Sequence, residues 1–143
     1  MEQLRHILRE HARPLVDSLT AELARRSHSR YRELDRSILS LRCRKLLEAL
    51  VECAWKGPEH LGEYVRTVAD RRLEEGFELE ELQRALRILE VNAWRIIANE
   101  STPASLTANL TALNTWMGFA RDELARVSQA HAYATAAHQS HPM

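Results

Sequence analysis

Glycine and proline are scarce in this chain, with four of each among 143 residues. Many-turned β architectures need more of both, because these residues set the backbone geometry of tight turns. Apolar residues make up 45% of the chain and charged residues 28%, a balance typical of a soluble helical domain. The composition therefore predicts an all-α fold, and the length predicts one domain.

Long apolar runs are also missing. No stretch approaches the roughly 20 consecutive apolar residues of a membrane-spanning helix. The N-terminus lacks the pattern of a signal peptide, in which a charged region precedes an apolar one and a cleavage site of small residues. We therefore expect a cytoplasmic protein with no membrane partner.

Only two cysteines are present, Cys43 and Cys53. Both fall on one predicted helix, ten positions apart, so about 15 Å separates them and they cannot form a disulfide within it. We interpret them as reduced thiols that pack as small apolar side chains. A redox-sensing role is the alternative.

Catalytic and metal-binding motifs are absent as well. The chain has no Gly-x-Ser-x-Gly elbow, no glycine-rich phosphate loop and no Glu-x-x-His pair for a carboxylate-bridged metal centre. The sequence therefore predicts no enzyme activity, no catalytic residue and no metal site. His138 and His141 have ligand spacing, but they lie in a predicted tail. For haem, His60 and His131 are the least unfavourable ligands, and we expect no cofactor.

Charge is balanced overall, with 20 basic and 20 acidic residues, but it is unevenly distributed. Residues 1–45 carry eleven Lys and Arg against six acids, whereas residues 46–100 carry seven against twelve. Such polarity favours complementary faces within one chain or between subunits. The Arg-rich stretch 25–45 is the only candidate for nucleic-acid binding. We favour a solvated loop over residues 27–36 instead.

The first half of the chain predicts two helices. Residues 2–27 have helical apolar spacing interrupted by Pro14, which predicts a kink or break near residues 12–13. Asp35 is a plausible N-cap for the next helix, which ends at Gly57. Pro58 then suits the first position of the following helix.

Two further helices are predicted within residues 61–97, joined at Gly76. A glycine there favours a left-handed C-terminal cap, which lets the chain reverse so that Phe77 packs back on the preceding turn. Arg72 can pair with Glu75 or Glu78 across the turn and fix the corner, and recognition of an anionic ligand is the alternative role of Arg72.

This central region resembles the N-terminal domain of RsbRD-type proteins. The run from Ala69 to Phe77 is followed by Leu79, Leu82 and a helix that reaches Trp94. The residues on the family pattern are Arg72, Gly76, Phe77, Leu82, Leu86, Leu89 and Trp94. Two positions depart from it, because Glu78 stands where the family tends to have a small polar residue and Glu90 where it tends to have a basic one.

The resemblance implies the all-helical sensor half of bacterial stressosome proteins called RsbT co-antagonists. Similar domains precede some histidine kinases and transcription regulators, and one related stressosome sensor domain has a globin-like fold. In that family the output is a C-terminal STAS domain. Because this chain has none, we expect either a sensory fragment of a longer protein or a stand-alone domain.

The last predicted helix has an uninterrupted apolar seam. From residue 106 to residue 127 its apolar positions alternate steps of four and three, which is typical of a coiled-coil-like contact. Thr102 and Pro103 give the start signal for this helix. The seam either closes the bundle or pairs with a second copy of the chain.

Together these patterns predict a bundle of four to six helices, with a kinked N-terminal helix, a long C-terminal helix and a globin-like arrangement as one option. The domain spans residues 1–130, and residues 131–143 form a disordered tail. We expect a non-catalytic bacterial signalling domain that forms homodimers and regulates a protein partner. The expected interface residues are Leu82, Leu86, Leu89, Ala93, Leu113, Met117 and Leu124. The alternative is a small-molecule or haem carrier with a pocket between Trp55, Trp94 and Trp116.

Overall fold

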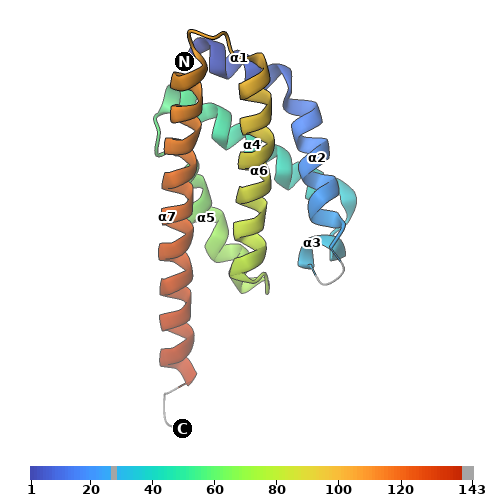
Figure 1. Ribbon diagram of the computed structural model, residues 1–143. Helices are drawn as coiled ribbons and strands as arrows, with labels where there is room; N and C mark the ends of the chain where they lie inside the picture. Colours follow the sequence, from blue (N-terminus) through green and yellow to red (C-terminus); the bar gives the residue numbers. More distant parts are fainter. Residues whose placement is uncertain (27–28, 140–143) are drawn as a thin grey trace.

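A computed structural model describes residues 1–26 and 29–139, and these residues form seven α-helices and no strand (Figure 1). The all-α class is thus confirmed. The number of helices exceeds the predicted four to six because the N-terminal helix breaks into two and α3 adds a single turn. The helices are α1 (Glu2–Glu10), α2 (Ala12–Ala24), α3 (Arg30–Glu33), α4 (Arg36–Lys56), α5 (His60–Glu74), α6 (Leu79–Glu100) and α7 (Leu106–Gln139).

The N-terminal helix breaks at His11, close to the predicted position. His11 leaves helical geometry, with φ −103° and ψ 16°, and α2 starts at the next residue. Pro14 then falls in the first turn of α2, where backbone N–H groups have no partner within the helix, so its missing donor costs nothing. The break therefore comes before the proline rather than at it.

Both ends of α4 follow the sequence signals. The carboxylate of Asp35 accepts hydrogen bonds from the backbone and the hydroxyl of Ser37. At the other end Gly57 has φ +118°, a conformation that side chains with a Cβ rarely adopt. Pro58 precedes the first turn of α5 rather than opening it, because the helix begins at His60.

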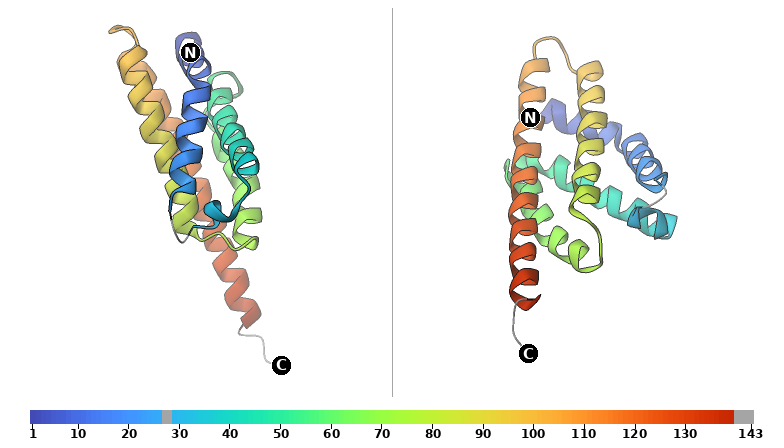
Figure 2. Two further views of the ribbon diagram at one scale, coloured as in Figure 1. Left: turned by 90° about the vertical axis from the view of Figure 1, so that its right-hand side faces the viewer. Right: turned by 60° about the horizontal axis from the view of Figure 1, so that its bottom comes forward.

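Helices α6 and α7 run antiparallel, side by side, and α7 also packs along α5 (Figures 1 and 2). On the other side of α6, α2 packs against both α6 and α4. One apolar core lies between these layers and takes side chains from every helix, although the one-turn α3 adds only Tyr31.

The proposed interface residues all belong to this core, so the structure corrects that expectation. Each is at most 7% exposed: Leu82, Leu86, Leu89, Ala93, Leu113, Met117 and Leu124. Because α7 lies against α5 and α6 of its own chain, the regular seam closes the bundle. None of the seven side chains is accessible to a second copy of the folded domain.

Helix α7 continues to Gln139, past the predicted domain boundary at residue 130. Its C-terminal end projects beyond the other helices (Figures 1 and 2). Side chains 132–137 are exposed, which agrees with the lack of large apolar residues there apart from Tyr133. Residues 131–139 are therefore helical rather than an irregular tail. The predicted start of α7 also shifts, because residues 103–105 form turns and the helix begins at Leu106.

Candidate functional site

The corner between α5 and α6 is built around Gly76, which has φ +99°. The backbone N–H of Gly76 donates to the carbonyl of Leu73 at 3.1 Å, and that of Phe77 donates to the carbonyl of Arg72 at 3.0 Å. This pair of bonds is a Schellman motif, which satisfies the last carbonyls of α5 and reverses the chain. Phe77 is consequently buried, and the centre of its ring lies 4.7 Å from the centre of the Tyr31 ring.

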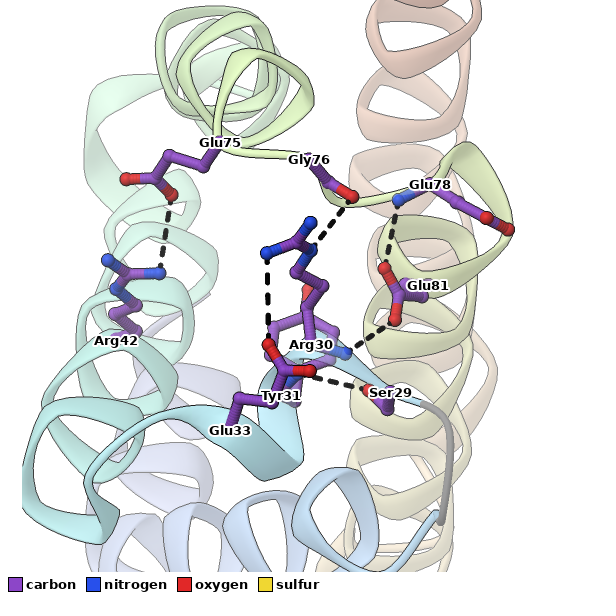
Figure 3. Close-up of polar contacts among 9 residues, drawn as sticks. All are labelled: Ser29, Arg30, Tyr31, Glu33, Arg42, Glu75, Gly76, Glu78 and Glu81. Atoms are coloured by element: carbon purple, nitrogen blue, oxygen red, sulfur yellow. Dashed lines mark hydrogen bonds and ion pairs between the residues drawn. The ribbon is translucent and has the colours of Figure 1, made fainter.

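Glu81 ties the corner to the short helix α3 (Figure 3). Its Oε2 accepts a hydrogen bond from the backbone N–H of Glu78 at 2.9 Å, and its Oε1 accepts one from the backbone N–H of Arg30 at 2.8 Å. Glu78 caps α6 in return, so the acidic departure from the family pattern still performs the capping role. One buried carboxylate therefore joins two segments that are distant in sequence.

The side chain of Arg30 also joins α3 to the α5–α6 corner. Its Nε donates to the carbonyl of Gly76 at 3.2 Å, and its Nη1 pairs with Glu33 at 3.7 Å (Figure 3). Ser29 caps α3 by accepting a hydrogen bond from the backbone of Tyr31. Within the expected solvated loop, residues 29–33 thus form an ordered brace, whereas residues 27 and 28 lie outside the described residues.

Two arginines from different helices meet at Glu75. Arg72 Nη1 lies 3.2 Å from Glu75 Oε1, and Arg42 Nη1 lies 3.6 Å from the same oxygen. The Arg42–Glu75 contact is drawn in Figure 3. Arg42 Nη1 is buried and has no hydrogen-bond partner, because 3.6 Å is beyond hydrogen-bonding distance. The sequence predicts the Arg72–Glu75 pair from its spacing, but nothing in the local sequence points to Arg42.

Behind these arginines lies a cavity of about 80 Å³ between α4, α5 and α6. Five lining side chains are only half-buried, so we infer that the cavity opens beside them: Arg42 and Leu46 on α4, and Tyr64, Val68 and Arg72 on α5. Its interior is buried and almost wholly apolar, and it includes Leu23, Leu39, Val65, Ala69, Ala85 and Leu86. The site combines a cationic mouth with an apolar interior.

Burial controls the ionisation of the phenols and thiols around this cavity. It raises the pKa of Tyr31 and of Tyr64, and the nearby Arg72 and Arg42 partly oppose the rise in both. Burial likewise raises the pKa of Cys43, and a hydrogen bond with Thr20 opposes it. These groups therefore stay protonated at neutral pH. The thiolate is the reactive form of cysteine, so this favours the packing role of Cys43 over a redox role.

The three tryptophans do not share a pocket, contrary to the alternative prediction. Trp116 is buried in the core, whereas Trp55 and Trp94 are 45% and 52% exposed on α4 and α6. The guanidinium groups of Arg5 and Arg9 lie 4.3 and 5.2 Å from the Trp55 ring centre. Tyrosine and arginine, rather than tryptophan, supply the polar groups of the cavity.

The candidate haem ligands lie away from the cavity. His60 Nε2 pairs with Glu52 Oε2 at 2.7 Å where α4 meets α5, and His131 is half-buried near the end of α7. His138 and His141 fall outside the described side chains. In the part of the chain that the structure covers, no three His, Cys, Asp or Glu side chains are grouped to hold a metal ion. No described helix is long and apolar enough to cross a membrane.

A family model for the RsbT co-antagonist protein rsbRD N-terminal domain matches residues 12–141. The match spans nearly the whole chain and includes the corner, the α3 brace and every residue that lines the cavity. The chain belongs to the RsbRD N-terminal domain family. Neither a curated protein nor a solved structure matches it. This RsbRD-type domain is thus a stressosome-associated signalling domain.

Proposed function

We propose that this RsbRD-type domain is a non-catalytic regulatory module of the bacterial cytoplasm, which forms homodimers and regulates a protein partner. Family membership supports a role in signalling complexes. The observation that carries the dimer is an apolar patch on the solvent side of α6, which we call the α6 patch and define as Val91 and Trp94.

The α6 patch is unusual for the surface of a small domain. Val91 is 48% exposed and Trp94 is 52% exposed, and the two residues lie three positions apart, so their side chains are neighbours on the helix. Tryptophan is enriched among the residues that dominate binding energy at protein interfaces. Two copies related by a twofold axis would bury the same patch on both subunits, which is the commonest way in which soluble proteins form homodimers.

A second exposed tryptophan offers a useful contrast. Trp55 is covered by Arg5 and Arg9, so part of its ring is already engaged within the chain. Trp94 has no such cover among the described residues. This difference favours α6 over α4 as the contact surface.

Light scattering at micromolar concentration tests the dimer. The unaltered chain is expected at about twice its mass of 16.5 kDa, and Trp94→Glu at the single-chain mass with an unchanged helical circular dichroism spectrum. Leu41→Glu is the matched control, because Leu41 is a similarly exposed apolar residue, on α4, and its variant should remain dimeric. A monomeric unaltered chain refutes the proposal.

A further inference from the structure

We propose that the cavity behind Arg42 and Arg72 is a binding site for a short-chain aliphatic carboxylate. The carboxylate would lie between the two guanidinium groups, and the hydrocarbon tail would enter the apolar interior. This site lies on the α4–α5 side of the domain, and the proposal does not depend on the dimer.

The charge at the mouth selects the sign of the ligand. Among the described residues that line the cavity, only Arg42 and Arg72 are charged. Both reach the same oxygen of one acid, Glu75, which is itself partly exposed. The two guanidinium groups therefore share a single carboxylate in their ion pairs, and the lining itself carries only positive charge. An anion fits this site, whereas a cation is repelled.

Arg42 also has hydrogen-bonding capacity that the chain does not use. Its Nη1 is buried without a hydrogen-bond partner, and a buried donor in this state favours any ligand that supplies an acceptor. The planar guanidinium group matches the geometry of a carboxylate and can form two parallel hydrogen bonds with it. The carboxylate of a ligand would therefore complete the contact that Glu75 makes only loosely at 3.6 Å.

Tyr64 can also bind the carboxylate of the ligand. Its side chain lies at the mouth with the arginines, and burial raises its pKa, so the phenol is protonated at neutral pH. A protonated phenol can donate a hydrogen bond to an anion. The rim thus offers donors from α4 and α5 together.

The size of the cavity limits the tail. Its volume of about 80 Å³ is roughly half that of the 150 Å³ apolar cavity that holds benzene, so a tail of roughly three or four carbon atoms fits. The walls are mostly apolar and come from six helices, α2 to α7, with Tyr31 as the contribution of α3. Butyrate is therefore a suitable probe.

Amide NMR of the full ¹⁵N-labelled chain tests the site directly. Sodium butyrate, compared with sodium chloride at the same ionic strength, should cause saturable shifts at Arg42, Cys43, Val65 and Val68, which line the cavity. The neutral 1-butanol has the same tail and should bind at least about tenfold more weakly, because it lacks the charge-assisted hydrogen bonds. Butylammonium should cause no saturable shift at these positions.

Two variants, each with a control at an exposed position, test whether the charges of the site determine butyrate binding. Arg42→Met retains the aliphatic stem and should weaken butyrate binding by about tenfold or more, whereas Arg44→Met, at an exposed position of α4, should leave binding unchanged. Glu75→Gln releases both arginines from their acid and should tighten binding severalfold, and Glu74→Gln is its exposed control.

Three results would overturn the proposal: no saturable shift with butyrate, equal binding of butyrate and 1-butanol, or undiminished binding to a folded Arg42→Met chain. If Arg42→Met does not fold, the comparison of butyrate with 1-butanol on the unaltered chain decides. Loss of the dimer in light scattering leaves all of these measurements unaffected.

Discussion

Gly76 is the residue on which the α5–α6 corner depends most. Its φ of +99° strains any residue that has a Cβ, and a Cβ built there would lie 2.7 Å from Arg30 Nη2. We therefore expect Gly76→Ala to lower the free energy of unfolding by about 1–3 kcal/mol. Urea denaturation followed by circular dichroism measures this change.

Gly118 provides the control for that substitution. It lies inside α7, and a Cβ built there has no heavy atom within 4 Å. Gly118→Ala should therefore stabilise the domain by about 0.5–1 kcal/mol, because alanine loses less backbone freedom in a helix. If both variants shift stability in the same direction, the account of the corner is wrong.

Cys53 links stability to pH. Burial raises the pKa of its thiol from 9.0 to about 11, although hydrogen bonds from the backbone of Leu61 and His60 oppose the rise. The folded state holds this proton more tightly than the unfolded state. The resulting stabilisation is therefore fully present below pH 9 and is lost as the pH rises towards 11.

Urea denaturation across this range tests the linkage. The free energy of unfolding should fall between pH 9 and pH 11, with a contribution from Cys53 on the order of 2 kcal/mol. Cys53→Ala should show a shallower decline, even if its stability at neutral pH is lower. A decline of the same steepness in both chains would show that Cys53 is not responsible.

The sequence predicts the role of a residue when its partners lie within a few positions of it along the chain. Arg72, Gly76 and Phe77 act within one turn, so the glycine and its spacing from the neighbouring acids are sufficient signals. Arg42 and Tyr31 act across helices, and single-sequence patterns contain no information on which distant side chain they meet. The cavity was missed for this reason.

The one-turn helix α3 also depends on a partner that is distant in sequence, so the sequence did not predict it. Its residues are polar and Arg-rich, which favours a solvated loop. Its order comes from Glu81, which lies 51 positions away from Arg30 and accepts a hydrogen bond from the Arg30 backbone. No local pattern could have predicted that contact.

Glu81→Ala is expected to release α3 from α6. The substitution removes the acceptor for two backbone N–H groups, those of Arg30 and Glu78, so we expect a loss of about 1–3 kcal/mol in stability. Amide hydrogen exchange should show faster exchange at Arg30. Glu80→Ala, next to it but exposed, should leave the exchange at Arg30 unchanged, and equal effects would exclude Glu81 as the tie.

The sequence correctly predicts the α7 seam as an apolar contact but leaves open whether the bundle itself or a second copy supplies the partner. An uninterrupted run of apolar positions at steps of three and four predicts a neighbouring helix without identifying the chain that supplies it. In the structure, α5 and α6 of the same chain fill that place. The exposed large apolar side chains lie outside this seam, and Val91 and Trp94 on α6 are among them.

For the domain as a whole, composition was enough to give the all-α class, and the pattern around Gly76 was enough to identify the family. The packing of α7 against α5 and α6 could not be derived, because it depends on side-chain shapes at many long-range contacts. The proposed regulatory role therefore rests on two observations. The family follows from the sequence, whereas the exposure of the α6 patch is known only from the fold.

The location of the dimer contact is the central claim, and oxidative cross-linking of Val91→Cys tests it most directly. A twofold axis at the α6 patch brings the two introduced thiols close enough for a disulfide, whereas the native Cys43 and Cys53 are buried and protonated at neutral pH. Leu41→Cys, on α4, is the control. We predict a covalent dimer for Val91→Cys and none for Leu41→Cys on non-reducing gels. Equal cross-linking of the two variants, or none in either, would contradict the account.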